Sequence, residues 1–144
     1  MTTVSIALIF PIAFIVLWVF ISWLLSALGG WSSLAAHYGI SSTPDNIQWF
    51  RWKSMALSRI KIFPVNYNNC LKMAFDETGM YLSPLIIFRI GHTTLKLPYQ
   101  DMNVEIGPFF FWEAARISMI NKQNLRIVLI GRSKKLFLEN YDAR

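Results

Sequence analysis

The feature that most constrains this chain is an apolar stretch without a charged side chain, which runs from Val4 to Leu28. As a helix rising about 1.5 Å per residue it is roughly 37 Å long, and the hydrocarbon core of a bilayer is about 30 Å thick. A single segment inside lipid must satisfy its own backbone hydrogen bonds, and only a helix does so. The sequence therefore predicts a transmembrane anchor over residues 1–30.

A cleaved signal peptide is the other interpretation of an N-terminal apolar stretch. Ala27-Leu28-Gly29 loosely resembles a small-residue cleavage site. A signal peptide, however, begins with a basic segment and has an apolar core of about 7–15 residues. This chain fits neither property, so we expect the anchor to be retained.

All charged side chains lie after the anchor, because no Asp, Glu, Lys or Arg precedes Asp45. The chain has 14 Lys and Arg and 8 Asp and Glu, so the whole net charge of +6 belongs to the downstream part. A basic domain beside a bilayer attracts anionic lipid headgroups. No motif typical of nucleic-acid binding is present, so nucleic acid is not an expected partner. The excess of Lys and Arg on this side predicts a single-pass protein of the inner (cytoplasmic) membrane, with the N-terminus outside and the domain in the cytoplasm.

The C-terminal half of the anchor carries two further patterns. Ser22, Ser26 and Gly30 are spaced by four residues and share one helix face, where small side chains let a partner helix approach closely. The other interpretation is coincidence in a helix that is rich in small residues. Three tryptophans bias this half of the anchor toward a membrane–water interface, namely Trp18, Trp23 and Trp31.

Residues 31–46 are expected to form an interfacial helix and a linker. Trp31–Tyr38 should be a short helix that Gly39 ends, with an apolar face lying in the headgroup region. His37 either faces lipid phosphate or is a solvated surface residue. Ile40–Asn46 has turn-forming residues and no apolar period, which is typical of a linker.

From residue 47 the apolar period changes to two, which predicts a small, mainly antiparallel β domain over residues 47–144. The expected hairpins are Asn69–Asp76 with Gly79–Leu82, and Arg116–Ile120 with Leu125–Ile130; the other expected elements are strands Leu85–Ile90 and Thr94–Leu97 and a C-terminal helix Lys134–Tyr141. The chain is therefore predicted to be an α+β protein with one anchor helix, one short helix and one β domain.

An aromatic run in residues 106–112 is one candidate contact surface; its members are Phe109, Phe110, Phe111 and Trp112. Neighbouring side chains of a strand point to opposite faces, so four adjacent aromatic residues cannot all point inward. The run is either a core strand or an exposed wedge that contacts lipid or a partner.

A second candidate surface is basic and follows the linker: Arg51, Lys53, Arg59 and Lys61. On an extended chain the two members of each close pair project to the same side. The set predicts a basic face turned toward anionic lipid, and the alternative is an ordinary solvated strand face.

Residues able to carry chemistry are few. Cys70, His37 and His92 are the soft metal ligands, and none of them lies at zinc-site spacing. A Cys70–His92 nucleophile pair would need a third group, such as Asp76 or Asp101, and nothing in the sequence demands it. Glycine-rich phosphate loops do not occur. We therefore expect no catalytic residue, no metal and no cofactor, and a lone cysteine excludes an internal disulfide.

Several local motifs carry a resemblance: GWxxLAxxY at residues 30–38, YNNCL at 67–71, GMYL at 79–82 and FRxGHxxLxxPY at 88–99. In this pattern the chain resembles small bacterial membrane proteins with a single span. The order of its expected strands is similar to that of bacterial pleckstrin-homology-like domains found beside membrane spans. This resemblance implies an orthogonally packed antiparallel sandwich closed by a C-terminal helix, and it implies no activity.

These observations favour a non-catalytic accessory or structural subunit that docks on a larger integral membrane complex through its anchor and β domain. The alternative is a membrane-surface binding module that recognises anionic lipid or a peptide through the basic face. An enzyme is the third interpretation, since the sequence offers no catalytic constellation.

Overall fold

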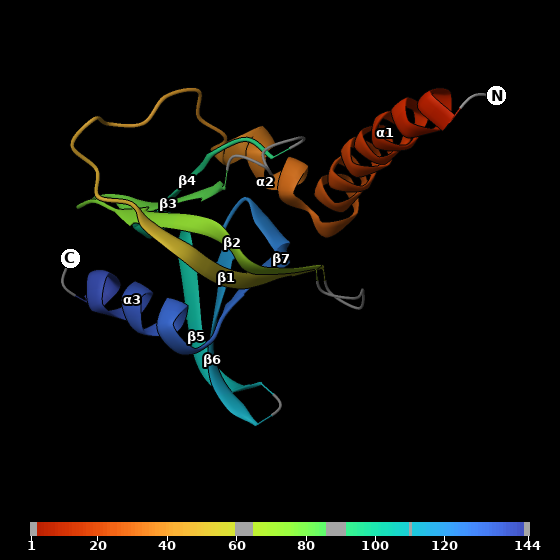
Figure 1. Cartoon of the computed structure of the whole chain (residues 1–144). Helices are drawn as coiled ribbons and strands as arrows, with labels where there is room; N and C mark the ends of the chain where they lie inside the picture. Colours follow the sequence, from red (N-terminus) through yellow and green to blue (C-terminus); the bar gives the residue numbers. More distant parts are fainter. Residues whose placement is uncertain (1–2, 60–64, 86–91, 110, 143–144) are drawn as a thin grey trace.

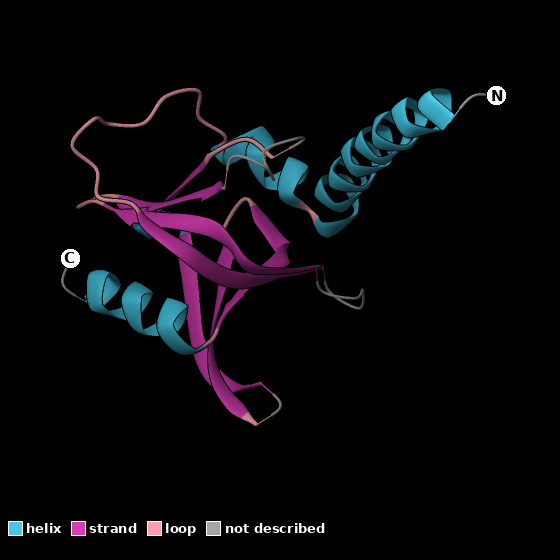
Figure 2. Cartoon of the chain, viewed as in Figure 1, coloured by secondary structure: helices cyan, strands magenta, loops and turns pink. Residues whose placement is uncertain are grey.

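The computed structural model describes residues 3–59, 65–85, 92–109 and 111–142. Within these residues the chain forms a long apolar helix, a short helix, a seven-stranded antiparallel sheet and a C-terminal helix (Figures 1 and 2). The elements are α1 (Thr3–Gly29), α2 (Trp31–Tyr38), β1 (Phe50–Arg59), β2 (Val65–Phe75), β3 (Gly79–Pro84), β4 (Leu95–Pro98), β5 (Met102–Phe109), β6 (Trp112–Met119), β7 (Lys122–Leu129) and α3 (Gly131–Asp142). The predicted α+β class is confirmed at this level.

Most of helix α1 projects away from the rest of the molecule, and only its C-terminal end contacts the domain. Its segment Thr3–Leu24 is long and apolar enough to cross a membrane, and no residue of its most apolar window is buried within the protein. These are properties that a membrane span shares with an N-terminal signal sequence. Pro11 lies inside α1, where it does not end the helix. Figure 1 shows α1 projecting away from the sheet at the upper right.

The sheet is open and has the strand order β4-β3-β2-β1-β7-β6-β5, with every neighbouring pair antiparallel. Strand β1 joins two meanders, because it pairs with β2 on one side and with the last strand, β7, on the other. The larger of two apolar clusters collects buried side chains from both meanders, from α2 and from α3, and the smaller cluster contains Ala56, Ala114 and Val128. The two halves therefore fold around one interior rather than as separate units.

Both hairpins predicted from the sequence are present. In the first, Asp76 accepts hydrogen bonds from the backbone N–H groups of Thr78 and Gly79 and so fixes the turn between β2 and β3. The second hairpin, β6–β7, has longer strands and a tighter turn than expected, because β7 already begins at Lys122. The strand predicted at Thr94–Leu97 is β4, shifted by one residue to Leu95–Pro98, whereas the one predicted at Leu85–Ile90 falls largely outside the described residues.

Strand β1 departs from regular alternation. Its register against β2 shifts on both sides of Lys53, and Trp52 and Asn69 adopt positive φ angles of 58° and 54°. The Ser54 hydroxyl supports this bulge by accepting a hydrogen bond from the Asn69 N–H at 2.8 Å. A bulge inserts an unpaired residue and re-aims the side chains that follow.

The C-terminal helix α3 begins at Gly131, three residues earlier than predicted. Phe137 is fully buried in the core, and its ring stacks on Tyr141 with centroids 5.3 Å apart. Near the N-terminus of α3, the Ser133 hydroxyl accepts a hydrogen bond from the Ser54 N–H of β1. These contacts fix α3 against the sheet on the side away from α1 (Figure 1).

Candidate interaction surfaces

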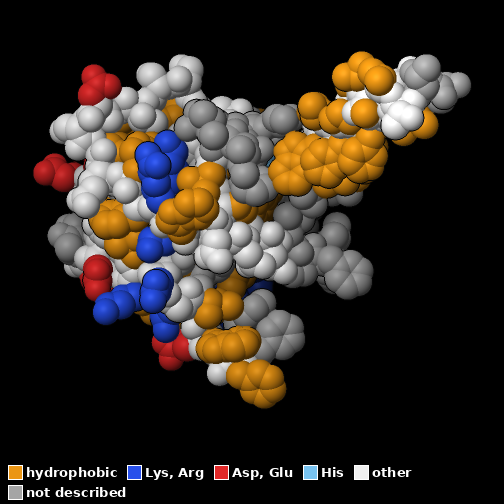
Figure 3. Space-filling model, in the orientation of Figure 1, with side chains coloured by type: hydrophobic (Ala, Val, Ile, Leu, Met, Phe, Trp, Pro, Cys, Tyr) orange, Lys and Arg blue, Asp and Glu red, His pale blue; other side chains and the backbone are white. Residues whose placement is uncertain are grey.

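The most extensive exposed apolar surface is α1 itself. Phe10 is 73% exposed, and Phe14, Ile15 and Trp23 are between 56% and 60% exposed. In Figure 3 hydrophobic side chains cover the helix on the visible face. A monomeric soluble protein rarely exposes a contiguous apolar surface this large, so lipid or protein is expected to cover α1.

The face of α1 that we predicted to receive a partner helix is already occupied. Ser22 is 7% exposed, Ser26 is 2% exposed, and Gly30 is buried. The C-terminal end of α1 contacts α2 and β1, and the Ser26 carbonyl accepts a hydrogen bond from Ser32. The prediction of a free partner face is therefore wrong, because these small residues face the chain's own domain.

Gly30 shows why a small residue is needed at this junction. It is the one residue between α1 and α2, and it has a φ of +97°, in the left-handed region where glycine is favoured. A Cβ atom at this position would lie 2.4 Å from Cδ2 of Leu125, a side chain in the core. The turn from α1 into α2 therefore fits directly against the sheet.

Trp31 is also wrongly predicted as an aromatic residue at the membrane interface. It is 0% exposed, and its Nε1–H donates a hydrogen bond to the Thr93 carbonyl at 2.8 Å. Its ring lies 5.4 Å from that of Tyr67 and 5.1 Å from that of His92. The apolar face of α2, which includes buried Leu34, thus packs on the domain core rather than in headgroups.

Tyr67 and His92 form the buried polar centre of this junction. The Tyr67 hydroxyl lies 3.0 Å from His92 Nε2, and both side chains are 6% exposed. Burial, with a further contribution from Cys70, raises the pKa of Tyr67 well above its ordinary value, so the hydroxyl stays protonated. The hydrogen bond satisfies both groups inside the core, which is a structural role.

The groups that a nucleophile pair would need are engaged elsewhere. Burial raises the pKa of the half-buried Cys70 thiol, which disfavours the thiolate. Asp76 accepts hydrogen bonds in its own turn, and Asp101 accepts one from the Tyr38 hydroxyl at 3.3 Å. The described residues contain no group of three or more His, Cys, Asp or Glu side chains placed to hold a metal ion.

The predicted basic face is described only in part. Arg51 is exposed and Lys53 is half-buried, but the bulge in β1 removes the regular alternation on which the prediction was based. The side chain of Arg59 and the whole of Lys61 lie outside the described residues. The four cations are therefore not established as one surface.

The described members of the aromatic run, Phe111 and Trp112, lie at the tip of the β5–β6 hairpin. Phe111 is 96% exposed and Trp112 is 58% exposed, and their rings lie 6.2 Å apart. Ile106, one strand away on β5, is 53% exposed. The side chain of Phe109 and the whole of Phe110 lie outside the described residues. In Figure 3 the lower end of the molecule carries a hydrophobic patch, where the β5–β6 hairpin of Figure 1 ends.

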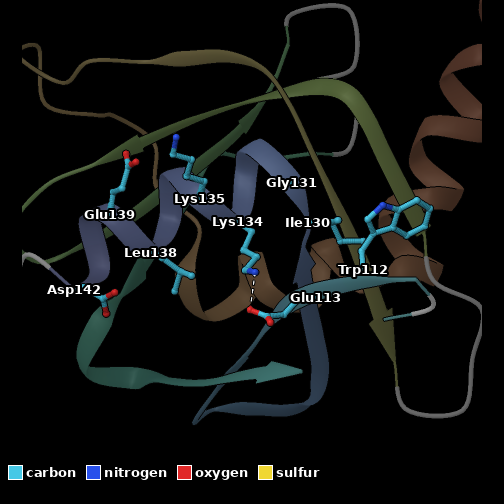
Figure 4. A pocket seen from close by; sticks show the side chains of 9 residues that line it. All are labelled: Trp112, Glu113, Ile130, Gly131, Lys134, Lys135, Leu138, Glu139 and Asp142. Atoms are coloured by element: carbon cyan, nitrogen blue, oxygen red, sulfur yellow. Dashed lines mark hydrogen bonds and ion pairs between the residues drawn. The ribbon is translucent and has the colours of Figure 1, made fainter. Parts of the chain in front are cut away.

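Beside this tip, an open groove of about 560 Å³ lies between α3 and the start of β6 (Figure 4). Its apolar lining comes from Trp112, Ile130 and Leu138. Lys134 donates a hydrogen bond to Glu113 at 2.8 Å, and this ion pair bridges α3 and β6. The full lining is Trp112, Glu113, Ile130, Gly131, Lys134, Lys135, Leu138, Glu139 and Asp142. We call this feature the α3 groove.

Two exposed features, Trp52 on β1 and the α3 groove, were not predicted from the sequence. Trp52 is 69% exposed and has a positive φ. It lies in the bulge of β1, which depends on the pairing of β1 with β2 and leaves no local sequence signal. The α3 groove did leave a signal, since the helix carries Lys134 and Lys135 near its start and Glu139 and Asp142 near its end. This charge order opposes the helix dipole, which favours acidic residues at the N-terminus and basic residues at the C-terminus.

Comparison of the chain with protein-family models, with curated proteins and with solved structures finds no match.

Proposed function

We propose that this protein is a non-catalytic, membrane-anchored accessory subunit that docks on a larger integral membrane complex. One observation carries the proposal: the most apolar window of α1 has no buried residue, while the chain after Gly29 folds around its own core. Such a helix needs a bilayer or a partner to cover it. We further propose that the anchor is retained, with the N-terminus outside and the domain in the cytoplasm.

The junction supports a role in positioning. Because α2 packs into the core through Trp31 and Leu34, the domain is joined to the anchor without a long flexible linker. A domain tethered in this way presents defined surfaces at a defined place beside the membrane. This arrangement suits a docking subunit better than a freely moving binding module.

We also propose that the sheet and α3 form a pleckstrin-homology-like domain. The antiparallel order of the seven described strands, with a C-terminal helix against the core, supports this assignment. The proposal concerns architecture alone and brings no lipid specificity with it.

Co-purification tests the proposed function. The full-length protein, extracted from native membranes in a mild detergent, should elute with a larger complex in a fixed ratio. Docking through apolar area should also persist when the ionic strength is raised, because salt screens charges but not apolar contacts. Recovery as a lone monomer would contradict the proposal. Retention on anionic vesicles that fades with salt would instead favour the membrane-surface module.

A further inference from the structure

The sheet has two edges, and within the described part of the chain only one of them is covered. At the first edge, Leu95 of β4 forms a bridge with Gly39, and the Thr94 carbonyl accepts a hydrogen bond from the Ile40 N–H. At the second edge lies β5, which pairs with β6 and with no other described strand. Strand β5 has 8 residues and β4 has 4. The longer edge strand is therefore the one without a neighbour.

The hydrogen bonds between β5 and β6 show which backbone groups face this open side. Directly before the first pair of the ladder, the Asp101 carbonyl accepts a hydrogen bond from the Ile120 N–H at 2.9 Å. In an antiparallel ladder, pairs that exchange hydrogen bonds alternate with pairs that do not. Every second residue of β5, counted from Asp101, therefore bonds to β6. The residues between them, Val104 and Ile106 among them, direct their N–H and C=O groups away from β6.

The first half of β5 offers these groups as a continuous row. Val104 and Ile106 each present a donor and an acceptor, and within the described residues neither is hydrogen-bonded to a backbone group of another element besides β6. Met102 presents its carbonyl alone, because its N–H is bonded to the Tyr99 carbonyl. The row of donors ends at Pro108, which has no N–H. This alternation of donors and acceptors matches an extended chain.

There is room for such a chain beside β5. Met102–Glu105 line a hollow of about 590 Å³, together with Tyr141 of α3 and Arg126 of β7. Tyr141 packs against the core, and so do Leu125 and Ile127, the strand neighbours of Arg126. Successive side chains of a strand point to opposite faces, so Arg126 lies on the outer face. The hollow therefore touches both faces of the sheet and runs past the edge of β5.

The side chains of β5 indicate what an added strand should carry. Glu105 is exposed, and it forms no ion pair within the described part of the chain. Ile106, the next residue, points to the other face and is 53% exposed. Side chains directly opposite each other in an antiparallel pair interact, and opposite charges are favourable there. A basic residue opposite Glu105 and an apolar residue opposite Ile106 would therefore stabilise the pairing.

We propose that the free edge of β5 binds an extended segment of a partner protein, which adds to the sheet as an antiparallel strand. The backbone of the segment bonds to Met102, Val104 and Ile106. Apolar side chains lie opposite these three residues, and a basic side chain lies opposite Glu105. The inference rests on the proposed function only for the origin of the segment, because the edge can be tested without the complex.

A labelled synthetic peptide with the central sequence Val-Lys-Val-Thr-Val and Ser-Gly flanks is the probe. Its first valine lies opposite Ile106, its lysine opposite Glu105 and its middle valine opposite Val104. Binding to the full-length protein in detergent is measured by fluorescence anisotropy.

Two N-methylated forms of the peptide separate strand addition from other kinds of binding. Methylation of the first and middle valines removes N–H groups that face β5. Each lost hydrogen bond costs about 0.5–1.5 kcal/mol, so the affinity should fall about 10-fold or more. Methylation of the lysine and the threonine removes N–H groups that point away from β5, and the affinity should stay within about 3-fold.

A charge exchange tests the register. Replacing the peptide's lysine by glutamate should weaken binding about 10-fold, because two carboxylates would then lie opposite each other. The variant Glu105→Lys should reverse this preference. Asp45→Lys, at an exposed position in the loop before β1, is the matched control and should leave the preference unchanged. Circular dichroism and the unfolding midpoint confirm that both variants are folded.

Equal affinities of the two N-methylated peptides, no binding of the unmodified peptide, or a charge preference that Glu105→Lys does not move would each overturn the proposal. Concentration-dependent dimers that exclude the peptide, detected by sedimentation, would assign the edge to a second copy of the chain and also overturn it. These outcomes are separate from the co-purification result. A complex that forms while the peptides fail retains the proposed function and removes the β5 edge from it, and peptide binding without a complex does the opposite.

Discussion

Trp31 and Trp112 are both tryptophans that the sequence suggested as interface residues, and they differ completely in environment. Trp31, at the junction of α1 and the domain, is fully buried, and its indole N–H is hydrogen-bonded. Trp112, at the tip of the β5–β6 hairpin, is 58% exposed beside an even more exposed Phe111. The difference separates two environments of aromatic residues: at the junction the ring contributes to the core, and at the tip the rings stay exposed to the surroundings.

The largest expected difference between the two regions is in stability. Trp31→Ala should lower the free energy of unfolding by about 3–5 kcal/mol, because it removes a fully buried ring and leaves a cavity. Trp112→Ala should change it by about 0.5 kcal/mol or less, as is usual at the surface. Urea unfolding of the full-length protein in detergent measures both. Similar losses of stability for the two variants would contradict the conclusion that Trp31, and not Trp112, contributes to the folded core.

Two glycines with positive φ allow a finer comparison. Gly30→Ala should lower stability by roughly 2–3 kcal/mol, because it adds both backbone strain and a clash with Leu125. Gly131→Ala, at the start of α3, adds strain alone, since nothing lies within 4 Å of its Cβ position, and should cost about 1 kcal/mol. The same unfolding experiment measures the pair. An equal effect at the two positions would mean that Leu125 moves aside freely.

The junction's polar centre should respond to loss of a single hydroxyl. Tyr67→Phe leaves His92 Nε2 without this hydrogen bond in the core, which should cost about 1–3 kcal/mol. Tyr38→Phe is the control: its hydroxyl makes longer, half-exposed hydrogen bonds of 3.2–3.3 Å to Asn121 and Asp101, and its loss should cost about 0.5–1 kcal/mol. Thermal unfolding of the two variants side by side gives the comparison, and a larger loss for Tyr38→Phe would contradict it.

The smallest expected effect is a pH dependence at the β2–β3 turn, away from both regions. Burial alone would raise the pKa of Asp76, but hydrogen bonds from Tyr81, Thr78 and Gly79 outweigh it and leave the pKa lowered. The carboxylate therefore stabilises the fold above the unfolded pKa of about 3.9. That stability is lost as the pH falls through the lower folded pKa. Unfolding midpoints between pH 6 and pH 2 should show this loss in the wild type.

Asp76→Asn supplies the control for the pH dependence, because its side chain does not titrate. The variant should be less stable than the wild type at pH 6, and the gap should narrow toward pH 2. A gap that stays constant would mean that Asp76 acts through the shape of the turn rather than through its charge.

The elements that the sequence predicted well are those defined by local patterns. Helix α1 follows from an uncharged stretch, and the β2–β3 hairpin follows from the turn chemistry of Asp76 and Gly79. The same reasoning found the β6–β7 hairpin and α3, with errors of a few residues at their ends. In each case the information lies within about ten neighbouring residues.

The errors occurred where a residue's neighbours are distant in sequence. Trp31 has the amphipathic spacing of an interfacial helix, but its hydrogen-bond partner is Thr93, 62 residues further along the chain. Ser22 and Ser26 have the spacing of a helix-packing face, and no local pattern says whether another protein or the chain itself covers it. Local sequence predicted which faces are suited to packing against another surface. It did not predict which of these faces the chain's own domain buries.

The single residue between α1 and α2 has a consequence for how the protein sits among its neighbours. With only Gly30 in between, and with that glycine wedged against Leu125, the domain turns whenever α1 turns about its own axis. A helix advances by about 100° per residue. One extra residue in the middle of α1 would therefore rotate the domain by more than a quarter of a turn about the helix axis. The length of α1 thus determines which way the domain faces relative to the exposed part of the helix.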